Sequence, residues 1–403
     1  MLIFNPLFHF NRQYFFEELS QTSRDVQQYF SLYGRLPIEI SRGCWWNKCS
    51  FCNQCIIHPN YREKTVDQIV TELQILSEKY QILSFQLIGD TLLKNNYSQL
   101  CEKIKSLQKD YQLFGEARAG QLKQNDYQRL KEAGFNHIQT GIETFSSNYL
   151  KKINKGVRII DNVAALKYSK ECGIINSYNL IVNYPNEEKI DFEQTKKTIK
   201  YFKQFIDPPH LSPLNVEYGT TIFCNPREFN VKEFNHTQID TLLFPKEILD
   251  KKIAWFYETE NKRELTNNWQ DLVKEWELDR EQREIQAVKS NLIADKYVFY
   301  YLDGGIFLKI YDKRNNENVM IYVLDQTERD VFLGCSDVIS FNKLQELFPH
   351  IADHELAAML HTFEEKGIVY REDDFYLGLP LNYRLLMGIS PEKPQKQVIS
   401  NLC

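Results

Sequence analysis

Residues 36–225 alternate between two hydrophobic patterns, short apolar runs and longer amphipathic segments. The apolar runs, which are typical of buried strands, are 37–41, 84–90, 113–119, 136–144, 176–184 and 214–218. The segments with helical spacing of apolar residues are 65–80, 97–111, 125–133, 159–172 and 192–205. Strands that alternate with helices predict parallel βα units joined by right-handed crossovers. Six such units predict a partial (βα)6 TIM-like barrel or a doubly wound sheet, and both bind ligands at the carboxyl ends of the strands.

The pattern changes after Pro226. The first part of this region, 246–285, is densely charged and predicted to be helical, with Trp255, Trp269 and Trp276 as apolar anchors. The segments that follow predict a hairpin from 297–310 and 319–324 around the polar turn 313–318, helices at 326–332, 341–348 and 354–366, and a second hairpin at 368–379. This order is typical of a winged helix. We therefore predict an N-terminal extension (1–35), an α/β core (36–225), a charged helical linker (226–295), a small winged-helix-like domain (296–385) and a flexible tail (386–403).

Composition and charge narrow the function classes. The chain has 403 residues, of which 43% are hydrophobic and 26% charged, and its net charge is −5. The acidic balance, together with Glu372, Asp373 and Asp374 in the predicted wing, argues against DNA binding because phosphates would be repelled. No apolar run is long enough for a membrane span, and the N-terminus lacks the features of a signal peptide. We therefore expect a cytoplasmic enzyme or binding protein.

Nine cysteines give the strongest chemical signal. Their number is odd, and Cys44, Cys49, Cys52 and Cys55 lie within twelve residues, directly after the first predicted strand. This arrangement predicts a local metal or cluster site in a reducing compartment rather than a disulfide framework. A loop of thiolates can hold an iron–sulfur cluster, and four cysteines can also hold zinc. The chain lacks the second Cys-x-x-Cys pair of a zinc ribbon, but a zinc knuckle or a chance group of buried thiols remains an alternative.

The segment SRGCWWNKCSFC, residues 41–52, resembles the radical S-adenosylmethionine (radical SAM) superfamily. Cys49-Ser50-Phe51-Cys52 matches the second half of its cysteine motif, whereas four residues, instead of the usual three, separate Cys44 from Cys49. The Cys-Trp-Trp sequence resembles the subgroup of RiPP maturation radical SAM proteins, which modify ribosomally made peptides. The resemblance implies that Cys44, Cys49 and Cys52 bind a [4Fe–4S] cluster, with Cys55 as an alternative ligand.

The resemblance also implies a cofactor site at successive strand ends. Its expected SAM contacts are Phe51, Gly89, Asp90, Glu116, Arg118, Gly141, Glu143, Lys155 and Asn179. Asp90 would face the amino group of SAM, Glu116 the ribose and Arg118 the carboxylate. The run TGIETFSSNYLKKINKG, which holds Glu143 and Lys155, is the best match, and Tyr184–Glu187 follows the fifth strand with Asn183 in place of a glycine. Taken singly, each acidic residue could instead be a helix cap or a surface charge.

The reaction implied by the resemblance is cleavage of SAM to a 5′-deoxyadenosyl radical, which requires an electron donor such as a flavodoxin or ferredoxin. About forty residues precede Cys44, and the chain has no Asp-x-His-x-x-Gly sequence, so we expect no cobalamin-dependent methylation. The remaining cysteines form no second cluster motif, so we expect no auxiliary cluster. We therefore predict epimerisation, crosslinking or related C–H chemistry on a precursor peptide.

One further cysteine is a candidate for catalysis. A peptide epimerase needs a hydrogen donor, commonly a thiol, and Cys224 is the best-placed spare cysteine, although a buried structural role is the alternative. Two other functions stay open: radical SAM modification of RNA or a small metabolite, and a non-catalytic zinc- or peptide-binding protein.

Overall fold

A parallel β-sheet forms the centre of the computed structural model, which describes residues 34–250, 256–259, 265–289, 297–315 and 319–389. Its strands follow the order β1 (Leu36–Glu39), β4 (Ser84–Ile88), β5 (Gln112–Arg118), β6 (Phe135–Gly141) and β7 (Ile175–Ser177), and all neighbours are parallel. A second parallel pair consists of β8 (Asn179–Val182) and β9 (His210–Pro213). A parallel bridge between Glu143 and Leu180 joins this pair to the end of β6. The prediction of an α/β fold with a parallel sheet is confirmed.

Helices connect the strands and pack on the sheet. They are α4 (Val66–Tyr80), α5 (Tyr97–Ser106), α6 (Gln124–Glu132), α7 (Ser147–Lys152), α8 (Ile159–Glu171) and α9 (Lys189–Ile199). Helix α4 begins where the sequence predicts, because Thr65 forms a capping box with Gln68. Strand residues such as Ile38, Leu87 and Ile138 are at most 1% exposed, so the hydrophobic core lies between the sheet and these helices.

The sixth parallel strand differs from the prediction. It is β9, whereas the predicted strand 214–218 contains only the short β10 (Val216–Glu217). β10 pairs antiparallel with β12 (Phe256–Thr259), which also pairs with β11 (Phe234–His236) in a separate sheet. In the sequence, the prolines around β9 are a signal against a strand at this position. They are tolerated because β9, among the described residues, pairs only with β8 and so needs few amide donors.

The linker is less regular than predicted. It contains the short helices α10 (Thr221–Cys224), η1 (Pro226–Phe229), α11 (Gln238–Leu243) and α12 (Lys246–Leu249), and then α13 (Thr266–Lys289). The predicted helix over 246–285 is therefore wrong in its first half, where β12 intervenes. Trp269 and Trp276 are buried on α13 as predicted, and their indole nitrogens donate to the Glu187 carboxylate (2.7 Å) and the Ile206 carbonyl (3.1 Å). Trp255 lies outside the described residues.

The C-terminal unit begins with three antiparallel strands rather than the predicted two, because Gly304 and Gly305 form an additional turn. These strands are β13 (Phe299–Asp303), β14 (Leu308–Asp312) and β15 (Met320–Leu324). The helices α14 (Gln326–Gly334), α15 (Phe341–Leu347) and α16 (Asp353–Glu365) follow, with the hairpin β17 (Val369–Glu372) and β18 (Phe375–Gly378). The short strand β16 (Ile339–Ser340), between α14 and α15, pairs with β18. After the hairpin the chain forms β19 (Leu381–Asn382) beside β13 and then helix α17 (Tyr383–Leu386).

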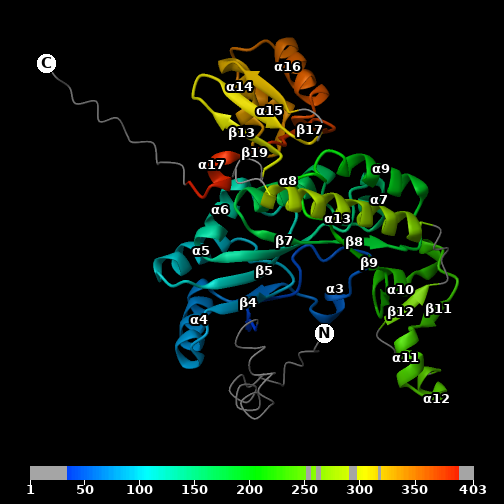
Figure 1. The fold of residues 1–403 in the computed structure, drawn as a ribbon. Coiled ribbons are helices and arrows are strands. Elements are labelled where there is room, and N and C mark those ends of the chain that lie inside the picture. Colours follow the sequence, from blue (N-terminus) through cyan, green and yellow to red (C-terminus); the bar gives the residue numbers. More distant parts are fainter. Residues whose placement is uncertain (1–33, 251–255, 260–264, 290–296, 316–318, 390–403) are drawn as a thin grey trace.

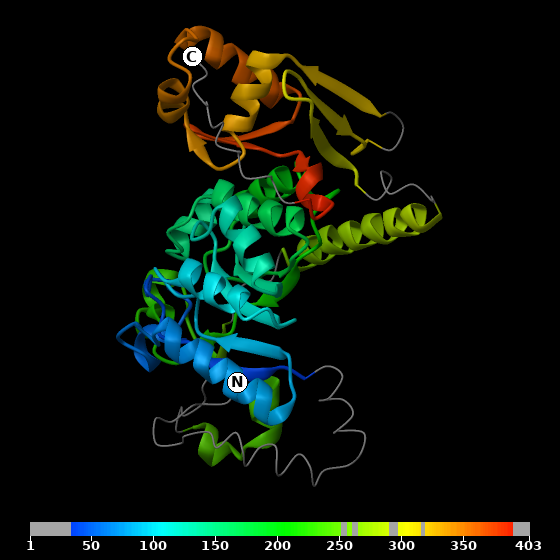
Figure 2. The same ribbon diagram turned by 90° about the vertical axis from the view of Figure 1, so that its left-hand side faces the viewer.

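The C-terminal unit packs against α8 of the core (Figures 1 and 2). Glu372, at the tip of the β17–β18 hairpin, accepts hydrogen bonds from the backbone amides of Ile159 (3.2 Å) and Ile160 (2.6 Å). Glu171, at the other end of α8, accepts from the Asn382 amide at 2.8 Å. Most of α8 is buried as a result. The hairpin therefore contacts the core with a carboxylate that caps the positive end of a helix.

Two predictions fall largely outside the described residues, the N-terminal extension 1–35 and the tail 386–403. In the parts of the chain that the structure does describe, no helix is both long enough and apolar enough to span a membrane.

Candidate functional site

The cysteine loop, residues 43–53, follows β1 and the short strand β2 (Ser41–Arg42) and leads into helix α3 (Gln54–Ile57). Cys44, Cys49 and Cys52 are partly exposed. The loop is fixed to the core at Ser50, whose amide donates to the Ile153 carbonyl (3.0 Å) and whose hydroxyl hydrogen-bonds Tyr184 (2.9 Å). The three thiols therefore lie at the carboxyl end of the parallel sheet, where the sequence places them.

The thiols lie in a partly desolvated environment with cations on one side. Burial raises the pKa of Cys52 to about 12 and raises that of Cys49, while Lys155 and Arg118 act on Cys49 in the opposite direction. Cys49 also interacts electrostatically with both Cys44 and Cys52. Within the described residues, no three His, Cys, Asp or Glu side chains are grouped closely enough to hold a single metal ion. Cys55 is part of α3, and its side chain lies outside the described part of the chain.

Glu143 and Lys155 form a buried ion pair beside the thiols. Their Oε1 and Nζ atoms are 2.6 Å apart, and Lys155 Nζ also lies 5.8 Å from the centroid of the Phe51 ring. Glu143 has a φ of +66°, and its backbone hydrogen-bonds the Asn179 carbonyl and the Ile181 amide on β8. A Cβ at Gly141 would lie 2.8 Å from Lys155 Nζ, so a larger residue at this position would push the lysine away.

Two further carboxylates complete the site on the other side of the loop. Asp90 accepts a hydrogen bond from the Gly43 amide and interacts with Cys52 and with Glu116. Burial and the Asp90 charge raise the pKa of Glu116 to about 7. At Gly89, a Cβ would lie 2.2 Å from Ser41 Oγ, so glycine permits the close approach of this strand end to the loop.

Arg118 contacts the cysteine loop itself. Its guanidinium hydrogen-bonds the Cys49 thiol and the Lys155 carbonyl and lies over the rings of Trp45 and Trp46. The resemblance implies that Arg118 binds the SAM carboxylate. The sequence analysis does not predict the contact between Arg118 and Cys49.

Cys224 lies on α10, which is attached to the same loop because the Ile222 amide donates to the Ser50 carbonyl at 3.3 Å. The Cys224 side chain is exposed, so the alternative of a buried structural cysteine is wrong. Glu217 also lies at this site, although the sequence analysis does not identify it. The only sequence feature that marks Glu217 is its position at the end of an apolar run. Its carboxylate accepts from the Asn53 amide and interacts with Cys52.

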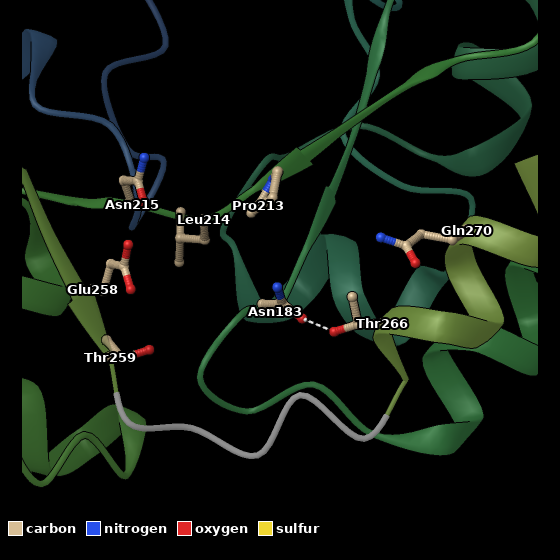
Figure 3. Close-up of a pocket in the computed structure, with 8 residues that line it drawn as sticks. All are labelled: Asn183, Pro213, Leu214, Asn215, Glu258, Thr259, Thr266 and Gln270. Carbon is tan, nitrogen blue, oxygen red and sulfur yellow. Dashed lines mark hydrogen bonds between the residues drawn. The ribbon is translucent and has the colours of Figure 1, made fainter. Parts of the chain in front are cut away.

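A cavity of about 410 Å³ opens at the ends of β8 and β9 (Figure 3). Its polar lining comes from the core and the linker and consists of Asn183, Asn215, Glu258, Thr259, Thr266 and Gln270, and Pro213 and Leu214 add apolar surface. Asn183 accepts a hydrogen bond from Thr266 at 2.8 Å, which ties β8 to α13. Asn215 precedes Glu217 by two residues, so the cavity lies about 7 Å along the chain from a residue that contacts the cysteine loop.

Comparisons with known proteins give a family match for the α/β core. Residues 38–199 match the family model described as the Radical SAM superfamily. An uncharacterized methyltransferase of Pyrococcus horikoshii is 24% identical over 67% of this chain and 52% of its own length. The anaerobic magnesium-protoporphyrin IX monomethyl ester cyclase of Rubrivivax gelatinosus is 26% identical over 42% of this chain and 31% of its own length. The chain thus spans about half, or less, of the length of these curated relatives.

Among solved structures, the radical SAM methyltransferase TsrM from Kitasatospora setae is similar over 55% of this chain and 45% of its own length, with 15% identity and a TM-score of 0.44. The family match over the cysteine loop and the parallel sheet defines the class: residues 38–199 form a radical SAM domain. Radical SAM proteins are enzymes that use a [4Fe–4S] cluster and SAM.

The residues of this chain fit those cofactors. Three cysteines, rather than four, leave one iron of a cluster open for SAM, and the cations at Cys49 compensate the charge of thiolate ligands.

Proposed function

We propose that this protein is a radical SAM enzyme that modifies a peptide. Cys44, Cys49 and Cys52 would hold the [4Fe–4S] cluster, and SAM would lie between Asp90 and Glu143. When bound, the cluster would supply one electron for the cleavage of SAM to methionine and a 5′-deoxyadenosyl radical, which would remove a hydrogen atom from the substrate. The single observation that carries this proposal is the convergence of the thiols with the carboxylate pair Asp90–Glu116 and the ion pair Glu143–Lys155.

The protein side chains have distinct tasks in this proposal. Asp90 is suited to accept hydrogen bonds from the SAM ammonium group, because its carboxylate is already oriented by the Gly43 amide. Glu116, with its pKa near 7, can accept from or donate to a ribose hydroxyl. Glu143 is held by Lys155 and by β8, so it would present a fixed carboxylate to the cofactor. These groups bind and orient SAM.

A more specific fold for the core and for the C-terminal unit belongs to this proposal. We propose that the six parallel strands form the partial (βα)6 TIM-like barrel of a radical SAM core, and that residues 296–385 form a winged-helix-like domain. A barrel of this kind gathers the ends of successive strands around one reaction centre. The reducing environment that free thiols require is consistent with a cytoplasmic enzyme, and a flavodoxin or ferredoxin would deliver the electron.

The C-terminal unit offers a surface for an extended peptide. Strand β15 lies at the edge of its sheet, and within the described residues it pairs only with β14. Met320, Ile321 and Val323 are more than half exposed, so this edge lacks the charges that usually protect an edge strand. A peptide that adds a strand to β15 would gain main-chain hydrogen bonds and bury these side chains.

The modified part of the peptide would enter the cavity at the ends of β8 and β9. The cavity is lined with amide and hydroxyl groups and has Glu258 as its charged member, which suits a polar peptide segment. Cys224 lies on a helix that contacts the cysteine loop and has an exposed thiol, so it remains the candidate hydrogen donor for an epimerisation. Crosslinking, which removes two hydrogens from the peptide, is the other reaction that this site could perform.

The proposal is tested by anaerobic reconstitution with iron and sulfide, followed by assay of 5′-deoxyadenosine from SAM and dithionite. Cys44→Ala should abolish cluster absorbance and lower 5′-deoxyadenosine formation by at least 100-fold. Cys101→Ala is the matched control, because Cys101 is buried on α5 away from the loop, and this variant should retain the activity. Full activity of Cys44→Ala would refute the assignment.

Co-expression with candidate precursor peptides tests the substrate class. An unchanged peptide mass with an altered stereocentre would indicate epimerisation, and loss of two hydrogens would indicate a crosslink. Ile321→Lys on β15 should weaken peptide binding and leave SAM cleavage unchanged.

A further inference from the structure

Arg118 lies in a clamp made by the two tryptophans of the cysteine loop. Its guanidinium carbon is 5.5 Å from the Trp45 ring centroid and 4.6 Å from that of Trp46, and the residue is only 8% exposed. The same guanidinium hydrogen-bonds the Cys49 thiol and the Lys155 carbonyl. The guanidinium is therefore held by both tryptophan rings of the loop and by hydrogen bonds to the loop and to the segment after α7, which fixes the position of the charge.

The clamp is held in place from the opposite side by residues 154–156. The Trp46 indole donates to the Asn154 carbonyl at 2.9 Å, and its six-membered ring lies against Gly156, where a Cβ would approach a ring carbon to 1.9 Å. Gly156 has a φ of +66°, so it is suited to this close contact for both steric and conformational reasons. Asn47, directly after Trp46, has a φ of +53° and turns the chain toward Cys49. The four-residue gap between Cys44 and Cys49 is accommodated by this anchored tryptophan and the turn that follows it.

We infer that Arg118, positioned by Trp46, is a residue that raises the reduction potential of the cluster held by Cys44, Cys49 and Cys52. One-electron reduction adds a negative charge to a cluster, and a fixed cation that hydrogen-bonds a ligand sulfur stabilises the reduced form more than the oxidised form. Arg118 interacts electrostatically with two of the three thiols, Cys49 and Cys44, and to a smaller extent with Glu143, and within the described residues its hydrogen bonds go to a thiol and a carbonyl. Its charge therefore acts on the cluster ligands in the absence of SAM.

This role is separable from the SAM-carboxylate contact that the resemblance implies. A carboxylate-binding arginine affects the affinity for SAM, whereas a cation on the cluster ligands affects the potential before SAM is added. The inference rests on the proposed cluster, but it does not depend on the substrate. Cluster assembly and 5′-deoxyadenosine formation by the wild type report on the proposed function, and the potential of the variants reports on Arg118.

The test is a redox titration of reconstituted, SAM-free protein, followed by electron paramagnetic resonance of the reduced cluster. Arg118→Gln removes the charge and should lower the equilibrium constant for reduction about tenfold, which is a shift of about 59 mV toward more negative potential for one electron. Arg118→Lys keeps the charge and should remain near the wild-type value. Arg129→Gln is the control, because it removes an arginine charge from the surface of α6 and should not shift the potential.

Equal SAM-free potentials in wild type, Arg118→Gln and Arg118→Lys would overturn the inference, and a weakened affinity for SAM in the same variants would assign Arg118 to the SAM carboxylate instead. If Arg118→Gln fails to retain a cluster, the reduction potential of Trp46→Phe tests the inference instead. This variant keeps the arginine but removes the indole hydrogen bond to Asn154. A shift to more negative potential in Trp46→Phe supports the clamp, and an unchanged potential overturns it.

Discussion

The contact between Gly156 and Trp46 leads to a quantitative prediction. In Gly156→Ala the new Cβ would lie 1.9 Å from the Trp46 ring, so the indole must leave its place or the backbone must move. Overpacking of this kind costs about 1–3 kcal/mol. The positive φ adds about 1–2 kcal/mol for any residue that has a Cβ. The lower entropy of the unfolded alanine chain offsets about 0.7 kcal/mol of this cost. We therefore expect Gly156→Ala to lower the free energy of unfolding by about 1–4 kcal/mol.

Gly305→Ala is the matched control for this prediction. Gly305 also has a positive φ, +84°, but nothing lies within 4 Å of the position that a Cβ would take there, so the substitution carries the conformational cost without the clash. Urea unfolding of the apo-protein, followed by circular dichroism, should show Gly156→Ala less stable than Gly305→Ala by about 1–3 kcal/mol. Gly156→Ala should also bind less iron per chain after reconstitution. Equal destabilisation and equal iron content in the two variants would refute the account of the Trp46 anchor.

Two further predictions concern titratable groups that are not part of the cysteine loop. Burial raises the pKa of Glu187 from its usual 4.5 to about 7, although the Trp269 indole and the Asn183 amide act in the opposite direction. The Glu187 carboxyl group therefore binds a proton more tightly in the folded state than in the unfolded state. This proton binding stabilises the fold fully below about pH 4.5, and the stabilisation is lost as the pH rises to about 7. The free energy of unfolding should fall by up to about 3 kcal/mol over this range. Urea titrations at several pH values should show this loss in the wild type and a smaller one in Glu187→Gln; identical pH profiles would contradict it. Among the thiols, iodoacetamide should label Cys224 well before Cys101, Cys172 and Cys335 in the native apo-protein. Cys224 is exposed, whereas the other three are buried, and burial raises the pKa of each of the three to about 12. Mass spectrometry after timed quenching measures the order of labelling, and a different order would contradict this prediction.

The sequence predicts the core elements well where local signals agree with burial. Helix α4 has both an apolar stripe and a capping box at Thr65, and it begins where these signals place it. The hydrophobic pattern does not predict β9, because the prolines there are a signal against a strand. It also does not predict β12, which interrupts a charged segment that is predicted to be helical. In both places the strand exists because of a partner far away in the chain, β8 for β9 and β10 and β11 for β12, and hydrophobic periodicity carries no information about such partners.

The site shows the same division. A parallel sheet brings the residues after its strands to one edge, so Asp90, Glu116 and Glu143 can be expected near the thiols from their positions alone. Glu217 escapes this reasoning because it belongs to a separate antiparallel sheet and reaches the loop through the Asn53 amide. The environment of Arg118 likewise depends on tryptophans about seventy residues earlier in the chain.

The two segments that resemble the radical SAM family most closely, residues 41–52 and 140–156, are in direct contact in the structure. Trp46 of the first segment hydrogen-bonds Asn154 and packs on Gly156 of the second, and Ser50 of the first is bound to Ile153 of the second. α8 begins directly after the second segment and is capped by Glu372 of the C-terminal unit, so the cysteine loop and that unit contact neighbouring parts of the chain. The loop contacts residues 153–156, whereas the C-terminal unit contacts the start of α8. Glu372→Gln is therefore the variant that separates docking of the C-terminal unit from the chemistry of the loop. It should weaken the capping of α8 and leave the contacts of Ser50 and Trp46 in place, so that iron binding persists while the C-terminal unit becomes more sensitive to limited proteolysis.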